Sequence, residues 1–227
     1  MTIQEYFGDW SAVVDLQEAD RIIRKLSTSS HNICPDVKDV FKAFRLCSYN
    51  NLKVLILGQD PYFDYRNHHP TATGIAFANS RDTSEDNYSS SLDVLRESVI
   101  DYSLPHGNIN FDPSLEEWES QGVLLLNAAL SCEAGKPGSH YLMWKPFISS
   151  LLVAFSKCNP GIVYVLMGSI AQSYLPCIDE SLNHVICIKH PSWYARQGEK
   201  MPHDLWRRVN NILIGQSGKG INWYTEY

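Results

Sequence analysis

Short runs of apolar residues alternate along the chain with longer segments in which apolar residues recur at helical spacing. The short runs are rich in valine, isoleucine and leucine and lie at residues 53–57 (KVLIL), 123–126 (VLLL), 162–166 (IVYVL) and 185–188 (VICI). Runs of this kind are typical of strands that are buried on both faces of a parallel sheet. The pattern therefore predicts four buried parallel strands.

Helical spacing predicts helices between and around these runs, at residues 13–26, 91–102, 114–122, 145–157 and 202–214. Ser114, three residues before Glu117, indicates a capping box that Gly122 closes, and Gly215 is the expected end of the last helix. Alternating strands and helices predict an α/β fold, with a central four-stranded parallel sheet flanked by helices. A length of 227 residues suits a single domain over residues 1–227, whose N-terminal helical segment is residues 1–33.

Each apolar run is followed at once by polar residues. Residues 58–62 (GQDPY) follow the first run, Asn127 the second, Gly168 and Ser169 the third, and residues 189–192 (KHPS) the fourth. In open α/β sheets the ligand binds at the carboxyl ends of the strands. We therefore expect these four segments to meet at one edge of the sheet.

The side chains expected at this edge suit recognition of a planar heterocycle. Asp60 and His190 are candidates for a base and an acid, or for groups that stabilise charge. The carboxamide of Asn127 has both a donor and an acceptor, and Tyr62 and Phe77 offer flat faces for stacking. Each residue alone is also compatible with a structural role, such as a turn for Asp60 or a helix cap for Asn127. Their joint placement favours a functional site.

Composition and charge limit the class of protein. The formal net charge of −6 argues mildly against a nucleic-acid partner, although backbone amides and hydroxyls can hold phosphates on an acidic protein. None of the six cysteines forms a CxxC pair, so reduced thiols of an intracellular protein are expected and not a zinc site. We expect neither a membrane span nor an N-terminal secretory signal, because no apolar stretch is long enough.

Several motifs resemble those of the family 1 uracil-DNA glycosylases. Residues 58–62 resemble the family's GQDPYH motif, residues 122–129 (GVLLLNAA) its base-reading strand, and residues 167–172 (MGSIAQ) its WGSxAQ segment. Further similarities lie at residues 40–44, Ser139-His140, residues 190–192 (HPS) and residues 221–223 (INW). In this order along most of the chain, the motifs are highly specific, whereas any one of them alone is weak.

The resemblance implies a uracil-DNA glycosylase of base excision repair. Such an enzyme is monofunctional, uses no metal and no cofactor, and hydrolyses the N-glycosidic bond of flipped-out uracil in DNA to leave an abasic site. The implied substrates are single- and double-stranded DNA that contains uracil, and a proteinaceous uracil-glycosylase inhibitor is a candidate partner. We expect a monomer without membrane association, which is cytoplasmic in a bacterium or virus and nuclear in a eukaryote.

The resemblance also implies roles for individual residues. Asp60 is expected to stabilise the sugar cation and orient water, and neutral His190 to donate a hydrogen bond to uracil O2, with help from amides near Gln59. Asn127 is expected to pair with uracil O4 and N3–H. Tyr62 is expected to exclude the methyl group of thymine, and Phe77 to stack on the ring.

Contacts to the DNA strand are expected from serines and one aromatic residue. The serines that align with the family's phosphate contacts are Ser91, Ser169 and Ser192, with Ser89 and Ser90 as alternatives to the first. Counting from the HPS segment places Tyr194 at the position of the family's wedge residue, which fills the gap left by the flipped base. Trp193 is the alternative.

The chain departs from the family pattern next to the first motif. Phe63 replaces the histidine of GQDPYH, and the segment 63–73 is longer than in typical members, with Asp64, Arg66, His68 and His69 among its residues. Three other functions stay open at this point. The first is a non-catalytic DNA-binding subunit, which the joint presence of Asp60, Asn127 and His190 disfavours. The second is a flavodoxin-like ligand binder, which lacks support because no Gly-rich loop follows the first strand. The third is a glycosylase that tolerates thymine, which Tyr62 disfavours.

Overall fold

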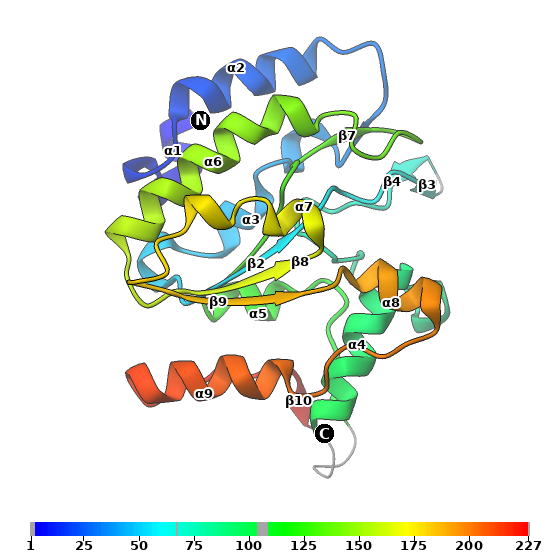
Figure 1. The fold of residues 1–227 in the computed structure, drawn as a ribbon. Coiled ribbons are helices and arrows are strands. Elements are labelled where there is room, and N and C mark those ends of the chain that lie inside the picture. Colours follow the sequence, from blue (N-terminus) through cyan, green and yellow to red (C-terminus); the bar gives the residue numbers. More distant parts are fainter. Residues whose placement is uncertain (1–2, 67, 104–108, 227) are drawn as a thin grey trace.

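A four-stranded parallel sheet lies between two layers of helices in the computed structural model, which describes residues 3–66, 68–103 and 109–226 (Figure 1). The strand order is β6–β2–β8–β9, with bounds Val123–Asn127, Val54–Gly58, Val163–Met167 and His184–Ile188. Every neighbouring pair is parallel. The predicted α/β fold is confirmed, and each predicted strand is found with its ends shifted by at most one residue.

Alternate residues of the central strands enter two separate cores. In β2, Leu55 and Leu57 face the core that contains α1, α2, α3 and α6, whereas Val54 and Ile56 face the core that contains α4 and α9. Successive side chains of a strand point to opposite faces, so a sheet covered on both sides needs apolar residues at every position. This explains why the interior of the sheet is formed by short apolar runs, of which β2, β6 and β8 are buried at every position.

The remaining elements surround this sheet. The helices are α1 (Ile3–Phe7), α2 (Leu16–Ser27), α3 (Lys42–Leu46), α4 (Ser90–Ser103), α5 (Glu116–Ser120), α6 (Tyr141–Cys158), α7 (Ser169–Gln172), α8 (Pro191–Gln197) and α9 (Leu205–Ser217). Three antiparallel pairs of short strands are β1 (Ile33–Cys34) with β7 (Cys132–Glu133), β3 (Tyr65–Arg66) with β4 (His69–Pro70), and β5 (Ile109–Asn110) with β10 (Thr225–Glu226). None of the helices in the described ranges is long and apolar enough to span a membrane.

Two predicted helices are shifted toward the C-terminus. The helix predicted at 13–26 begins at Leu16, because the Asp15 carboxylate accepts hydrogen bonds from the backbone N–H groups of Gln17 and Glu18 and caps it there. The helix predicted at 202–214 is α9, which continues past Gly215 to Ser217 and has Gly218 as its C-terminal cap. Gly218 has a φ of 73°, the left-handed conformation that terminates helices.

The start predicted for α6 was also wrong. The helix begins at Tyr141 and not at residue 145, so Pro146 lies inside it. A proline in the second turn removes one backbone donor but leaves the rest of the hydrogen-bond ladder in place. Apolar residues on both sides of Pro146, among them Trp144 and Phe147, bury the helix against the core and hold it together.

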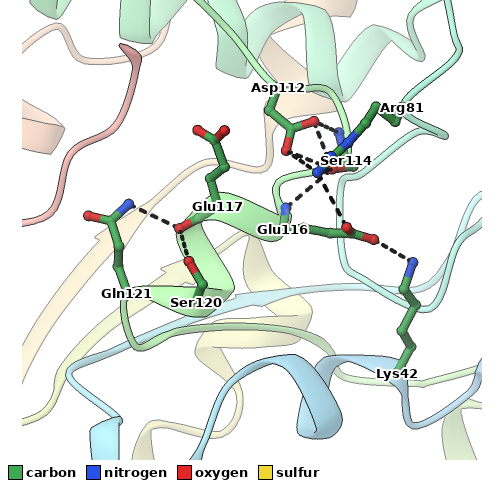
Figure 2. Close-up of polar contacts among 8 residues, drawn as sticks. All are labelled: Lys42, Arg81, Asp112, Ser114, Glu116, Glu117, Ser120 and Gln121. Carbon is green, nitrogen blue, oxygen red and sulfur yellow. Dashed lines mark hydrogen bonds and ion pairs between the residues drawn. The ribbon is translucent and has the colours of Figure 1, made fainter.

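The capping box predicted at Ser114 is absent from α5 (Figure 2). The helix is capped by Leu115, which has a left-handed backbone. The Ser114 hydroxyl donates to the Asp112 carboxylate at 2.7 Å and accepts only a long hydrogen bond of 3.4 Å from the N–H of Glu116. The side chain of Glu117 points away from the helix start. Arg81 joins Asp112 and Glu116 by ion pairs of 3.2 and 3.3 Å, so charge pairing organises this turn where a cap was expected.

Candidate active site

The loops that follow the four central strands meet at one edge of the sheet, because all four strands run in the same direction. A pocket at this edge is lined by residues from each of the predicted segments except that after β8. The predicted base-contacting and catalytic residues that it brings together are Asp60, Tyr62, Phe77, Asn127 and His190. Residues that are far apart in sequence thus face a single cavity.

A wider groove adjoins the pocket and shares Asp60, Tyr62 and His190 with it. Gln59 lies in this groove and is exposed, so the structure does not place it in the pocket with the other predicted base contacts. Its backbone carbonyl accepts a hydrogen bond from the N–H of Ala129 at 3.0 Å, which ties the loop after β2 to the loop after β6.

Asp60 is held by one hydrogen bond from a distant loop. The backbone N–H of Gly138 donates to Oδ2 of Asp60 at 2.6 Å, and the described residues offer no partner to Oδ1. Burial raises the pKa of Asp60 above its ordinary value, and the Gly138 amide partly opposes this shift. The carboxylate is therefore fixed at one oxygen and open at the other.

His190 is a neutral donor in this environment. Its burial, helped by the positive charge of Arg196, lowers the pKa of the imidazole to about 4. His190 caps α8, and its Nδ1 accepts the backbone N–H of Ser192 at 3.2 Å. Because Nδ1 accepts, the proton of the neutral ring resides on Nε2. Arg196 donates a hydrogen bond to the oxygen of the Ser192 hydroxyl at 3.1 Å. The hydrogen of that hydroxyl is therefore directed to Nδ1 of His190, which accepts it as well.

Asn127 is the last residue of β6 and lies opposite Gly58 in the sheet register. It is not a helix cap. Its side chain is buried, with 8% of the residue exposed, and has no hydrogen-bond partner among the described residues. A Cβ atom on Gly58 would lie 2.5 Å from Oδ1 of Asn127 and 2.7 Å from Cζ of Phe77. The glycine therefore leaves space for both side chains, and the carboxamide is available to a ligand.

Tyr62 and Phe77 are joined by a hydrogen bond. The Tyr62 hydroxyl donates to the backbone carbonyl of Phe77 at 2.7 Å. Phe77 has a φ of 68°, a conformation that costs a bulky residue free energy and persists only when its surroundings hold it. Its ring lies 5.6 Å from the ring of His190. The hydroxyl of Tyr62 thus helps to fix the backbone that presents the aromatic wall of the pocket.

The segment before Phe77 is attached to the open edge of β6. The N–H of Ala76 donates to the carbonyl of Leu125 at 3.2 Å, and the N–H of Leu125 donates to Oε1 of Glu119 at 3.1 Å. Glu119 is fully buried, its Oε2 has no partner, and burial raises the pKa of its carboxyl well above the ordinary value. A buried carboxyl group from α5 therefore covers the edge strand that carries Asn127.

The predicted phosphate-binding serines all line the groove. Ser169 is the first residue of α7, Ser192 lies in α8, and Ser91 is the second residue of α4. Ser91 is only 4% exposed, whereas the neighbouring Ser90 is exposed and lines the same groove. Ser89 is buried and accepts a hydrogen bond from Asn79, so it does not face the groove.

The two aromatic residues proposed as the wedge, Tyr194 and its alternative Trp193, lie in different surroundings. Tyr194 is 7% exposed and packs in the core below the sheet, whereas Trp193 lines the groove. Adjacent residues of a helix point about 100° apart, so α8 presents only one of the two rings to the groove. Counting along the sequence does not show which of the two faces the groove. The ammonium group of Lys189 lies 3.2 Å from the centre of the Trp193 ring.

The longer segment after the first motif folds into the hairpin of β3 and β4. Phe63, just before it, is 44% exposed and lines the groove. His68 and His69 are exposed, and the parts of the chain that the structure describes contain no group of three or more potential metal ligands.

Three contributors to the site were not found from the sequence. They are the Gly138 amide on Asp60, the Arg196 charge near His190, and the Glu119 carboxyl behind Asn127. The Gly138–Asp60 contact joins residues that are 78 positions apart, and no local pattern indicates it. Arg196 carried a weak signal, because it lies one helical turn after Ser192.

Known proteins resemble this chain in sequence and in fold. A sequence model of the Uracil DNA glycosylase superfamily matches residues 44–214. The chain is 33% identical over 223 residues to the uracil-DNA glycosylase of Vibrio campbellii, with 97% of this chain and 91% of that protein covered. It is 32% identical over 200 residues to that of Amoebophilus asiaticus, with 88% and 87% covered.

Solved structures share the fold at lower identity. The crystal structure of mimivirus uracil-DNA glycosylase matches with a TM-score of 0.79 and 20% identity, covering 97% of this chain and 86% of that one. Wild-type UNG from Nitratifractor salsuginis matches with a TM-score of 0.61 and 20% identity, covering 97% and 96%. Two variants of the mimivirus enzyme are also similar, and both were solved in complex with UGI.

Proposed function

The chain belongs to the uracil DNA glycosylase superfamily, and from this premise we propose how its residues remove uracil from DNA. It is a hydrolase of base excision repair that cleaves the N-glycosidic bond of uracil in DNA. The bond of a stacked base is out of reach, so the nucleotide is flipped out and the pocket receives the base.

Asn127 selects uracil over cytosine. Its Nδ2 donates to uracil O4 and its Oδ1 accepts from N3–H, whereas cytosine presents a donor and an acceptor in the reverse order. The free carboxamide supports this role, because its donor and its acceptor have no protein partner and the side chain lines the pocket that receives the base. A mismatched base would leave both ends of the amide unpaired.

Tyr62 and Phe77 shape the slot. Phe77 stacks on the flat ring, and Tyr62 lies against C5, where thymine carries a methyl group. The hydrogen bond from the Tyr62 hydroxyl to the Phe77 carbonyl supports this arrangement, because it ties the Tyr62 ring to the backbone that carries Phe77. A rigid wall excludes a methyl group more effectively than a mobile one.

Asp60 stabilises the positive charge that develops on the sugar. Cleavage of the glycosidic bond passes through an oxocarbenium-like state, and an ionised carboxylate beside the sugar lowers its energy. Gly138 fixes Oδ2, while Oδ1 is free to face the sugar and to orient the attacking water. The raised pKa requires the pH to exceed that value before the carboxylate is charged.

His190 stabilises the negative charge on the leaving base. The Nε2–H of the neutral ring donates to uracil O2, where this charge collects, and no full proton transfer is needed. A ring with a pKa of about 4 carries no charge near neutral pH, so it is present as the required donor in nearly every molecule.

The groove holds the DNA strand on either side of the flipped nucleotide. Hydroxyl groups of Ser90 or Ser91, Ser169 and Ser192 contact phosphates, and Arg196 adds a charged donor beside Ser192. Trp193 acts as the wedge, because it is the ring of α8 that lines the groove.

A proteinaceous inhibitor is a candidate partner for the same groove. UGI binds the mimivirus variants that share this fold. In this proposal the chain works as a monomer, since the residues of one chain line the whole pocket. We also propose that residues 1–227 form one domain. The N-terminal helices α1 and α2 support this, because they pack in the same core as α6.

The observation that carries the proposal is the meeting of Asp60, Asn127 and His190 in one pocket with Tyr62 and Phe77. The test is to incubate the purified chain with an oligonucleotide that contains one uracil, in the presence of EDTA, and then cleave abasic sites with alkali. We expect strand breaks at uracil only. Asp60→Asn and His190→Leu should reduce turnover by orders of magnitude and leave the far-ultraviolet circular dichroism unchanged. Intact strands with the unaltered chain would refute the proposal.

A further inference from the structure

Phe63 is an aromatic side chain at the surface, in a place where the rest of the lining is mostly polar. It is 44% exposed, and it lines the groove together with Asp60, Ser169 and Ser192. It also borders the adjoining hollow that Tyr65, His68 and Gly135 line. A single exposed apolar side chain is ordinary, but one beside the reactive groups needs a reason.

The backbone of Phe63 is fixed although its ring is exposed. Its carbonyl accepts a hydrogen bond from the N–H of Gly135 at 2.8 Å, and the nearby strands β3 and β4 pair with each other. The ring therefore stands on a rigid base at the surface. An aromatic side chain has few rotatable bonds, so on a fixed backbone it loses little conformational entropy when it stacks on a ligand.

Phe63 and Trp193 both line the groove, on segments that follow different strands of the sheet. Phe63 is three residues after Asp60 in the loop that follows β2, and Trp193 is three residues after His190 in the helix that follows β9. Only β8 lies between β2 and β9, so the two loops begin about 10 Å apart. Two aromatic rings therefore border a groove into which the flipped nucleotide must pass.

We propose that Phe63 stacks on a base adjacent to the flipped uracil in the DNA strand. This inference rests on the proposed function and adds a residue that determines strand binding. A phenyl ring has no hydrogen-bond donor and gains nothing from a phosphate, whereas every base has a flat face on which it can stack, whatever its sequence. Alanine substitution at such a platform lowers affinity by roughly tenfold or more for each stacked base.

The test removes the ring and the base separately. Phe63→Ala and the unaltered chain are assayed on single-stranded oligonucleotides with one uracil, in which the neighbouring nucleotide on the 5′ side, the 3′ side or both carries a base or a tetrahydrofuran residue without one. On the complete strand, Phe63→Ala should lower kcat/KM roughly tenfold. On the strand that lacks the stacked base, the unaltered chain should fall to the same value and Phe63→Ala should fall no further.

Two further variants separate stacking from a structural role. Phe63→Trp should retain kcat/KM, because it keeps a flat ring. Leu142→Ala, which removes a side chain that is 82% exposed on α6 and lines none of the pocket or groove, should leave kcat/KM unchanged. An equal loss for Phe63→Ala on strands with and without the neighbouring base would overturn the proposal, and so would no loss at all.

Binding measurements keep this outcome separate from the proposed function. The same four-way comparison is repeated by fluorescence anisotropy in an Asp60→Asn background, in which uracil stays attached to the strand. If the chain binds the strands with the predicted dependence on ring and base but releases no uracil, the glycosylase proposal fails and the stacking proposal stands. If the chain excises uracil but its binding does not depend on the Phe63 ring and the neighbouring base, the glycosylase proposal stands and the stacking proposal fails.

Discussion

At the scale of single residues, the surroundings of a side chain decide which chemistry it performs. His190 has two donors directed at Nδ1 and a buried ring, so it is a neutral Nε2–H donor and not a titrating acid. Asp60 is anchored through one oxygen and free at the other. Negative charge builds up on uracil O2 as the glycosidic bond breaks, and a fixed neutral donor can stabilise this charge without transferring its proton.

The lowered pKa of His190 predicts how stability depends on pH. An unfolded histidine binds a proton below about pH 6.5, whereas the folded ring resists protonation until about pH 4. The unfolded state therefore binds more protons in this window, and the free energy of unfolding falls as the pH falls through it, by about 3 kcal/mol in total. His190→Asn removes the titration and keeps a side chain that can cap α8. Urea unfolding across the window should show a flatter profile for this variant, and parallel profiles would contradict the prediction.

Asn127→Asp should weaken the discrimination between uracil and cytosine. The carboxylate has no donor for O4 of uracil, so each group left unpaired costs about 1–3 kcal/mol. We expect the kcat/KM for uracil to fall about tenfold to a hundredfold for each such group, and the ratio of uracil to cytosine excision to fall with it. The matched control is Asn222→Asp at an exposed position outside the pocket and groove. An unchanged ratio would show that Asn127 does not read the base.

At the scale of elements, the parallel sheet places the reactive residues, and close contacts between its strands hold them. β2 and β6 pair in register so that Gly58 lies opposite Asn127. At the open edge of β6, the carbonyl of Leu125 accepts the N–H of Ala76, and the N–H of Leu125 donates to the Glu119 carboxyl from α5. The position of the carboxamide thus depends on packing against β2, α5 and the segment before Phe77.

Gly58→Ala should impair activity more than stability. The new methyl group would lie 2.5 Å from the Asn127 side chain and 2.7 Å from the Phe77 ring, so both must move away from the slot. A displacement of this size at a reacting group costs about a hundredfold in rate. The control is Gly215→Ala, which meets no atom within 4 Å inside α9 and should raise the unfolding free energy by about 1 kcal/mol. Equal activity in both variants would contradict this account.

Glu119 should make the protein less stable as the pH rises. Its pKa is raised in the folded state, so the folded protein holds a proton that the unfolded chain has released. The unfolding free energy then falls by up to about 1.4 kcal/mol for each pH unit between the unfolded and the folded pKa. Glu119→Gln keeps an acceptor for the Leu125 N–H and removes this slope. Thermal unfolding at several pH values tests it, and an unchanged slope would exclude the buried acid as its source.

The elements could be predicted from sequence to the extent that their signals are local. Three of the four strands are buried at every position, and the apolar runs alone located all four. The predicted helix ends were less accurate. The start of α2 was placed from the spacing of apolar residues, although Asp15 was available as an N-terminal cap. Contacts between distant segments, such as Gly138 with Asp60, and the phase of α8, which buries Tyr194 and turns Trp193 to the groove, depend on the assembled fold.

At the scale of the whole molecule, an acidic protein binds a polyanion through a narrow set of contacts. The net charge is −6, and the basic residues that line the groove in the described part of the chain are Lys189 and Arg196. Lys189 is partly engaged with Trp193, and Arg196 with Ser192. We therefore expect hydroxyl groups and aromatic rings to supply much of the affinity that other DNA-binding proteins obtain from charge.

Binding to single-stranded DNA should consequently depend only weakly on salt. Two phosphate contacts by cations predict a slope of about −1.4 for the logarithm of the association constant against the logarithm of the salt concentration. Arg196→Gln should reduce the magnitude of this slope by about 0.7. Anisotropy titrations of Asp60→Asn with a uracil-containing strand provide the measurement. A slope several times steeper would mean that basic residues outside this groove dominate binding.

The central claim is that Asp60, Asn127 and His190 surround one slot that fits uracil, and a crystal structure of the chain with free uracil tests it most directly. We predict the ring in the pocket at the carboxyl ends of the strands, stacked on Phe77, with O4 and N3–H on the Asn127 carboxamide and O2 within hydrogen-bond distance of Nε2 of His190. Uracil bound elsewhere, or bound in this pocket with the Asn127 and His190 side chains turned away from it, would contradict the claim.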